Sequence, residues 1–455
     1  MHSLEWGEAQ KIAGKDPDFN RRDLWEAIET GEFPEYEFGV QLVAEADEHS
    51  FDVDLLDATK LIPEEQVPVR PVGKMVLNRN PDNFFAETEQ VALHTANIVP
   101  GIDFTNDPLL QMHNFSYLDT QLIRLGGPNF VQLPVNRPLV EVSTNQRDGY
   151  HQSRVHTGRT AYSKNTLGGG CPAIADERVF RHYQQKVEGH KIRKRAASFQ
   201  DYYSQPTLFW NSMSEWEREH IVVAFRFELG KCDHMHIREA VVEQLNRIDH
   251  RLATQVADGV DVKPPAAQAQ PNHGRSSPAL SQANPATDTI RSRKVAILVA
   301  DGVEAGPVTA LRGRGAVAEL LAPTNGALRT SAGEELAVDR AMNTMASVLY
   351  DAVVVAGGEA AVATLGADGY AMHFIAEAIK HAKPVAAMGT GAALVGRATA
   401  NVVTLATTDG PLPNEHGVLG APSVTTELPE KFIESFCDLL AGHRIWTRST
   451  AAIPA

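Results

Sequence analysis

A tyrosine, a glutamine and an arginine recur at helical spacing in the stretch from Asp107 to Gly127, DPLLQMHNFSYLDTQLIRLGG. Gln121 and Arg124 follow Tyr117 by four and seven residues, so the three side chains share one helix face. His113 and Thr120 lie on the same face. A phenol oxygen can bind a metal, and a guanidinium one or two turns further on can bind a carboxylate. The face is therefore either a cofactor-binding surface or an ordinary solvated polar face.

The ends of this helix are marked by residues with known terminal preferences. Asp107 suits the N-cap and Pro108 the first helical position. Gly126-Gly127-Pro128 supplies the stop at the other end. An apolar stripe runs along roughly the opposite side of the helix, at Phe115, Leu118, Leu122 and Leu125. The sequence therefore predicts one amphipathic helix that carries the candidate site.

Long motifs around this helix resemble the haem-binding region of catalases. They are NFSYLDTQLIRLGGPNF, VLNRNPDNFFAETEQ and VPGIDFTNDPLLQ. The similarity is greatest to the large-subunit class, which has an extra C-terminal domain. It extends from His2 to about Ile453 and is strongest over residues 2–137 and 180–250. The resemblance implies a haem of the b or d type with its iron, hydrogen peroxide as substrate, and a homotetramer.

The resemblance also implies roles for individual residues. Tyr117 matches the proximal haem ligand, because catalases bind the iron through a tyrosine. Ferric iron lowers the phenol pKa from its ordinary value of about 10, so a phenolate can persist at neutral pH. Arg124 matches a residue that contacts a haem propionate, to which a guanidinium fork is suited. Gln121 and Thr120 are expected to flank the porphyrin.

Two histidines are expected to tune the tyrosine. His113 stands where many catalases have an arginine that hydrogen-bonds the phenolate, and a histidine would make that bond depend on pH. His94 matches a histidine that is covalently linked to the ligand tyrosine in some large-subunit catalases. The alternatives are an ordinary helix-face histidine at position 113 and a buried histidine near the haem edge at position 94.

The distal histidine and asparagine of catalases have no match in this sequence, so we assign no catalytic acid or base to this chain. By the resemblance these residues are expected upstream of Met1, and general acid–base help is worth about 10²–10⁴-fold in rate. We predict a catalase, a haem hydroperoxidase that protects against oxidative stress but is inactive alone if its N-terminal part is lacking. One alternative is a non-enzymatic haem-binding or assembly fragment that needs a separate N-terminal half. A third hypothesis is a sensor or chaperone built on the C-terminal domain.

Composition excludes several other classes of function. The net charge of −15 argues against a nucleic-acid or anionic-membrane partner. No apolar run is long enough to span a membrane, and the N-terminus has no apolar signal core. Three widely spaced cysteines fit a reducing cytoplasm and indicate neither a disulfide framework nor a cysteine metal site. We therefore predict a cytoplasmic enzyme.

The chain is expected to be an α+β multidomain protein with six parts. These are the C-terminal portion of the catalase barrel at 1–70, a wrapping arm with the haem-ligand helix at 71–175, a helical domain at 176–255, a flexible linker rich in Ala, Pro, Gln and Ser at 256–292, a flavodoxin-like α/β domain at 293–446 and a tail at 447–455. The missing barrel strands would leave an open sheet edge.

Local patterns predict the elements of the first three parts. A helix at Arg21–Thr30 should bury Trp25 and Ile28, and a strand is expected near Glu35–Val43. Gly-Gly-Gly at 168–170 is expected to be a flexible loop. The helical domain carries an apolar stripe that should form its core, at Ile237, Val241, Leu245, Ile248 and Leu252.

The C-terminal part alternates short apolar strands with helices such as Tyr370–His381, a doubly wound pattern. Its strands are expected in KVAILVA, AVAELLA, DAVVVAGG, KPVAAMG and VVTLA. This part resembles the glutamine-amidotransferase-like family, whose catalytic members place a cysteine on a sharp strand-to-helix turn. Gly389 stands at that place, so nucleophilic catalysis is not expected and the acidic Glu304 is interpreted as inert. The segment from Ala300 to Gly315 suggests a shortened first helix, and the domain's role is predicted to be structural or accessory.

Overall fold

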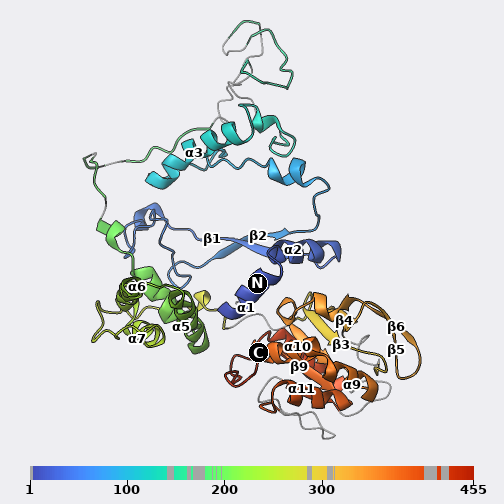
Figure 1. Ribbon diagram of the computed structural model, residues 1–455. Coiled ribbons are helices and arrows are strands. Elements are labelled where there is room, and N and C mark those ends of the chain that lie inside the picture. The colour runs from blue at the N-terminus through green and yellow to red at the C-terminus, as the bar shows by residue number, and fades with distance from the viewer. Residues whose placement is uncertain are drawn as a thin grey trace. The chain divides into compact units, whose positions relative to one another are not determined.

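The computed structural model describes residues 4–140, 148–160, 165–167, 180–186, 188–190, 192–195, 197–283, 289–304, 311, 313–403, 418–421 and 430–455 (Figure 1). The chain divides into two compact units. One comprises residues 38–73 and 79–205, and the other comprises residues 1–37, 74–78 and 206–455. The predicted glycine loop at 168–170, Cys171 and most of the shortened first helix of the C-terminal domain lie outside the described residues.

The smaller unit contains α3 (Pro108–Arg124) and few other regular elements. Its short helical turns are η1 (Glu45–Asp47), η2 (Phe85–Glu89), η3 (Phe130–Gln132) and η4 (Ala197–Gln200). The strands β1 (Glu35–Val40) and β2 (Arg70–Val76) form a two-stranded sheet whose residues are shared between the units. The predicted strand near Glu35 is therefore present, and the low regularity expected for the arm is observed in its described part.

The larger unit begins with α1 (Trp6–Lys15) and α2 (Phe19–Glu29). Helix α2 confirms the helix expected at Arg21–Thr30, but the prediction that Trp25 belongs to a core is wrong. Trp25 is 42% exposed and Ile28 is half-buried. Spacing alone predicted an apolar face for α2, but it could not show how little of that face would be covered. Helix α2 has no fully buried residue.

Four helices of the larger unit pack around a small apolar core. They are α4 (Ser204–Ser212), α5 (Glu215–Gly230), α6 (Met235–Ile248) and α7 (His250–Gly259). The predicted stripe is confirmed at Leu245 and Leu252, which are buried, while Val241 and Ile248 pack partly buried against the same core. Ile237 is 39% exposed, so its assignment to the core is wrong. It lies in the first turn of α6, and the buried residues of this helix begin only at Val242.

Most of the segment predicted as a flexible linker is attached to these helices. Helix α7 extends into its start, and η5 (Pro278–Leu280) lies near its end. The Ser277 amide donates to Ser212 Oγ at 2.8 Å, and the Gln282 amide donates to Glu217 Oε1 at 2.8 Å. Ser281 Oγ donates to the other carboxylate oxygen of Glu217 at 2.7 Å. Two backbone amides and one serine side chain of the segment thus bind it to side chains of α4 and α5.

The C-terminal part is built on a six-stranded sheet with the order β10-β9-β8-β3-β4-β7, in which every neighbouring pair is parallel. The strands are β3 (Lys294–Leu298), β4 (Val317–Ala322), β7 (Arg340–Ala341), β8 (Ala352–Val355), β9 (Val385–Met388) and β10 (Val418–Ala421). Four of the five predicted strands are present, and the fifth, VVTLA, falls largely outside the described residues. The predicted α/β class with a parallel sheet is confirmed.

Helices and a hairpin complete this domain. The helices are α9 (Glu359–Ala367), α10 (Gly369–Lys380), α11 (Ala392–Ala398) and α12 (Glu430–Ala441), with short turns η6 (Met342–Thr344), η7 (Ser347–Leu349) and η8 (Gly389–Gly391). Strands β5 (Gly326–Arg329) and β6 (Glu335–Val338) form an antiparallel pair that the sequence did not predict. Helices α10 and α11 contact β8 and β9, and α10 fits the helix expected at Tyr370–His381. Strands buried on both faces read as continuous apolar runs, which is why the sequence revealed them.

Among the described residues, no helix is both long and apolar enough to cross a membrane.

Candidate functional site

Helix α3 has the ends that the sequence predicts. The Asp107 carboxylate accepts hydrogen bonds from the Leu109 amide at 2.9 Å and the Leu110 amide at 3.2 Å, and Pro108 is the first helical residue. Gly126 adopts a φ of +82°, a left-handed conformation that glycine tolerates after a helix. The helix therefore holds its candidate side chains in a fixed register.

The burial of α3 is the reverse of what its amphipathic pattern indicates. Phe115 is 69% exposed, and Leu118 and Leu122 on the same stripe are exposed as well. Gln121 on the polar face is buried, while Tyr117 is half-buried. The polar face is thus the one that packs against protein within this unit, and the apolar stripe faces outward.

Arg124 and Gln121 form a clamp that joins α3 to the segment at residues 89–93. Arg124 Nη1 donates to the Glu89 carbonyl at 2.7 Å, and its Nη2 donates to the Val91 carbonyl at 2.6 Å. Gln121 Nε2 donates to the Leu93 carbonyl at 3.0 Å. The two side chains also bind each other, since Arg124 Nη2 donates to Gln121 Oε1 at 2.6 Å. Most of the N–H groups of Arg124 are therefore engaged, and one on Nη1 has no hydrogen-bond partner among the described residues.

Two asparagines that the sequence reasoning missed complete this arrangement. Asn136 Oδ1 accepts from the Ala92 amide at 2.8 Å, and its Nδ2 donates to the Gln90 carbonyl at 2.9 Å. Asn114, on α3, accepts from Thr95 Oγ1 at 2.8 Å. The backbone leading to His94 is thus fixed from both sides. An asparagine in a loop gives no local signal of such a role, because its partners are distant in sequence.

His113 stands one turn before Tyr117, and their ring centroids are 5.7 Å apart. The Nδ1 atom of His113 lies 2.7 Å from the Leu109 carbonyl, which can only accept, so Nδ1 carries a proton. A neutral His113 therefore donates its one N–H to the Leu109 carbonyl. It could donate a hydrogen bond to the tyrosine oxygen through Nε2 only when both ring nitrogens are protonated.

His94 is half-buried, and its Nδ1 accepts a hydrogen bond from the Ala96 amide at 3.1 Å. The proton of the neutral ring is therefore on Nε2. Burial lowers the pKa of His94, so the ring is neutral at pH 7. Bonding through Nδ1 to another group would require the Ala96 hydrogen bond to break. The proposed link to Tyr117 stays a prediction.

The donor set suits a cofactor bound through a single phenol oxygen. No hydrogen bond to the Tyr117 hydroxyl is present among the described residues, and Thr120 on the same face is exposed. No group of three or more His, Cys, Asp or Glu side chains in that part of the chain is placed to hold a metal ion. The phenol oxygen of Tyr117 could hold a metal that is bound mainly by another framework. The clamp leaves Arg124 one N–H on Nη1 for a further acceptor rather than a free two-pronged fork.

In the C-terminal domain, the turn after β9 keeps the shape expected of a nucleophile turn without its nucleophile. Gly389 has a φ of +48° and begins η8. The Glu304 carboxylate lies beside Gly357, since a Cβ built on that glycine would come within 2.6 Å of Glu304 Oε2. Without a thiol at position 389, the turn lacks the group that would attack a substrate.

Three family models match successive parts of the chain. The model named Catalase matches residues 1–169, Catalase-related immune-responsive matches 196–260, and the C-terminal domain found in long catalases matches 291–450. Together they cover both the candidate site on α3 and the α/β domain.

Curated relatives align along the whole of this chain. Catalase HPII of Mycobacterium avium is 60% identical over 460 residues, which cover 100% of this chain and 65% of the relative. Catalase HPII of Pseudomonas aeruginosa is 50% identical, covering 100% of this chain and 63% of the relative. Catalase-2 of Bacillus subtilis is 48% identical, covering 98% and 64%. The chain thus spans just under two thirds of the length of these relatives.

Proposed function

We propose, from the premise that this chain belongs to the large-subunit catalases, that it serves the haem-dependent disproportionation of hydrogen peroxide to water and dioxygen. The observation that carries the proposal is Tyr117, which lies on a helix with a capped start within the matched catalase region. Its neighbours fix its surroundings through hydrogen bonds rather than through an apolar core. That arrangement is suited to a phenol that must keep one position while it bears charge.

Tyr117 would hold the iron of a bound haem, and the haem would supply the redox chemistry. The chain's own contribution is to keep the phenol oxygen available and in place. Because a neutral His113 uses its one N–H on the Leu109 carbonyl, it would give the phenolate no hydrogen bond.

Arg124 and Gln121 would contact the haem while keeping the hydrogen bonds of their clamp. The remaining N–H of Arg124 Nη1 can donate to one oxygen of a propionate without breaking the bonds to residues 89 and 91. Thr120 and Gln121 would flank the porphyrin, and His94 would approach the tyrosine from the clamped segment. The described residues supply these proximal contacts, and we assign none of them as the distal acid or base.

We infer further that the protein binds haem b or d and assembles as a homotetramer in the cytoplasm. Cysteine usage supports the compartment: of the three cysteines, Cys232 and Cys437 are free, and Cys171 lies outside the described residues. For the C-terminal domain we propose a flavodoxin-like arrangement. Its five longer strands follow the order 2-1-3-4-5 once the two-residue β7 is set aside, and this order supports the proposal.

The test is purification with haem supplied, followed by an absorption spectrum and an oxygen-evolution assay with hydrogen peroxide. Tyr117→Phe should lose haem retention, because phenylalanine keeps the ring and removes the phenol oxygen. Tyr150→Phe is the matched control, since Tyr150 is 87% exposed in the same unit. Full haem retention by the Tyr117 variant would remove the ligand assignment.

The same measurements separate catalase activity from haem binding alone. Oxygen release that depends on Tyr117 would support the enzyme. A tyrosinate-type ferric spectrum without oxygen release would instead support the haem-binding or assembly fragment. The comparisons favour the enzyme, because relatives that match the whole chain carry catalase names.

A further inference from the structure

Helix α1 carries a fully buried carboxylate on its apolar side. Glu8 and Ile12 are four residues apart on α1, so they share one helix face, and Leu4 lies just before the N-cap residue Glu5. Leu4 and Ile12 belong to an apolar cluster with Ala346, Val348 and Leu349 of the C-terminal domain. Glu8 lies between them and is 0% exposed. A charged group in that place requires specific partners, since an unpaired buried charge is strongly unfavourable.

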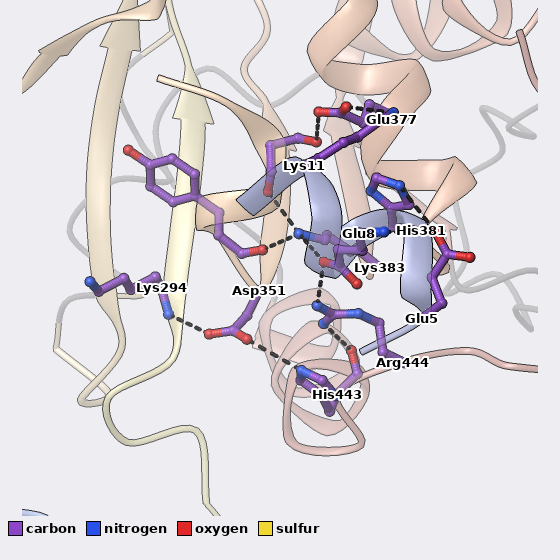
Figure 2. A network of polar contacts seen from close by, with 12 residues as sticks. Glu5, Glu8, Lys11, Lys294, Asp351, Glu377, His381, Lys383, His443 and Arg444 are labelled. Carbon is purple, nitrogen blue, oxygen red and sulfur yellow. Dashed lines mark hydrogen bonds and ion pairs between the residues drawn. The ribbon is translucent and has the colours of Figure 1, made fainter. Parts of the chain in front are cut away.

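The partners come from the C-terminal domain, and Figure 2 shows them converging on Glu8. Lys383 Nζ lies 2.9 Å from Glu8 Oε1, and Arg444 Nη2 lies 3.0 Å from the same oxygen. Lys383 is itself 0% exposed, and Arg444 is buried. We call Lys383 and Arg444 the carboxylate socket.

The socket is held in shape by backbone carbonyls. Lys383 Nζ also donates to the Ser347 carbonyl at 2.7 Å and the Tyr350 carbonyl at 2.6 Å. With Glu8 as the third acceptor, all three ammonium protons are used. Arg448 Nη1 donates to the Lys383 carbonyl at 2.8 Å, which fixes the backbone of the lysine. The lysine is therefore fully satisfied only while a carboxylate occupies the socket.

Electrostatics favour an ionised Glu8. Burial opposes its ionisation, but the positive charges of Lys383 and Arg444 prevail and lower the pKa of Glu8 below its ordinary value. Burial lowers the pKa of Lys383 to about 8 against the opposing effect of Glu8, so the lysine is largely protonated at pH 7. A neutral group at position 8 would leave a buried ammonium without its counter-charge.

Two flanking contacts align the helix over the socket. Lys11 Nζ lies 2.9 Å from Glu377 Oε1 on α10, and His381 Nε2 lies 3.5 Å from Glu5 Oε1 at the start of α1. The Glu8 and Lys11 contacts thus join opposite charges, whereas burial lowers the pKa of His381 to about 4, so its ring faces Glu5 as a neutral group. Such a pattern fixes the register of the helix as well as its attachment.

We propose that the C-terminal α/β domain is a receptor for the N-terminal helix, and that its ligand is the Glu8 carboxylate seated in the socket of Lys383 and Arg444. The C-terminal domain thereby gains a function as an internal clamp on α1. One feature points to a small-carboxylate site once the helix residue is shortened. Arg444 Nε is buried without a hydrogen-bond partner, so the socket contains a donor atom that the Glu8 side chain does not saturate.

The experiment is chemical rescue in the full-length chain. Glu8→Ala removes the carboxylate and leaves a space that formate can enter. Glu239→Ala is the matched control, because Glu239 is exposed on α6. Hydrogen exchange is measured for peptides covering α1 and covering β3 and β8. Acetylation of lysines, read by mass spectrometry, reports whether Lys383 becomes accessible.

We expect Glu8→Ala to raise the exchange rate of α1 by about tenfold or more, since breaking a buried ion pair is strongly destabilising. Lys383 should become acetylated, while the exchange of β3 and β8 stays at the wild-type rate. Formate should restore the slow hydrogen exchange of α1 and the protection of Lys383 from acetylation. Sodium chloride at the same ionic strength should restore neither. The Glu239 variant should match the wild type in either salt.

Glu8→Gln keeps the shape of the side chain. It replaces Glu8→Ala in the hydrogen-exchange test if the alanine variant fails to fold. It should also release α1, because the amide has no charge to offset the ammonium. Unchanged α1 exchange in Glu8→Gln would overturn the proposal, as would a Lys383 that stays protected in Glu8→Ala. Equal rescue by chloride would overturn the assignment of the socket to carboxylates.

Discussion

The C-terminal α/β domain and the region around α3 are stabilised in opposite ways. The domain has a continuous apolar core that includes Ile297, Val353, Ile375 and Phe436. In the described part of residues 38–73 and 79–205, Phe130 is the apolar side chain that is fully buried. Around α3 the main contacts are instead hydrogen bonds from side chains to backbone, made by Gln121, Arg124 and Asn136.

This difference indicates what each region requires from its surroundings. A sheet with apolar strands and helices packed on it can bury its own apolar area. The outward apolar stripe of α3 is contiguous exposed surface of the kind that marks an interaction site. The C-terminal domain therefore supplies its own apolar core. The apolar stripe of α3 is left uncovered within its own unit, so apolar packing supplies little stability there.

The largest expected effect comes from truncating a core phenylalanine. Phe436→Ala should lower the free energy of unfolding of the C-terminal domain by about 3–5 kcal/mol, because Phe436 is 1% exposed and its removal leaves a cavity. Phe115→Ala on α3 makes the same chemical change at a 69% exposed position and should change stability by no more than about 0.5 kcal/mol. Calorimetric unfolding of both variants checks the comparison. Equal losses would show that the stripe on α3 is covered in solution.

A second prediction concerns acid, to which the C-terminal domain should be sensitive. Burial lowers the pKa of His443 to about 4, against an ordinary value of 6.5, although Asp351 lies 3.4 Å from its Nε2. Between pH 6.5 and 4 the unfolded chain binds a proton that the folded domain does not. Stability is therefore lost as pH falls through this window, by about 3 kcal/mol for this one residue.

His443→Gln keeps a donor for Asp351 but does not titrate, so it should flatten the dependence of stability on pH below 6.5. His373→Gln, at a position whose side chain is 58% exposed, is the control and should leave the slope as it is. Unfolding midpoints measured from pH 7 to pH 4 give both slopes. A slope unchanged by His443→Gln would mean that other groups carry the acid response.

The smallest effect is expected from the α3 clamp. Arg124→Met removes the charged donors to the Glu89 and Val91 carbonyls and should lower the local stability of residues 89–95 by about 2 kcal/mol. Hydrogen exchange of peptides covering that segment measures the loss. Arg137→Met, at an exposed position in the same unit, should have no effect on it. If Arg124→Met left exchange unchanged, the asparagine contacts would be sufficient to hold the segment.

The elements of the fold could largely be predicted where local preference and burial agree. Helix α3 begins and ends where its capping residues indicate, and four apolar strands of the sheet were found from their sequence alone. Predictions of burial were less secure. Trp25 and Ile237 were expected in cores and are exposed, because periodicity identifies the apolar side of a helix but not what covers it. The hairpin of β5 and β6 is half-exposed and lacks a continuous apolar run.

The candidate site divides in the same way. Residue types and spacing placed Tyr117, Gln121 and Arg124 on one face of a helix. The resemblance to catalases then predicted that this face binds haem. Which hydrogen-bond partners these side chains take depends on residues more than twenty positions away, such as Leu93 and Val91. The proton on His113 Nδ1 likewise follows from its contact with a backbone carbonyl.

The sequence by itself determined where helices start and stop, which strands are buried on both faces, and which side chains α3 presents together. These properties depend on neighbours in the chain, through capping, backbone sterics and the helical repeat. Only the tertiary structure decided that α3 packs by its polar face and that Glu8 is enclosed by Lys383 and Arg444. The latter contact joins residues 436 positions apart. Local preferences cannot encode such a contact, since desolvation and pairing of a charge depend on everything that surrounds it.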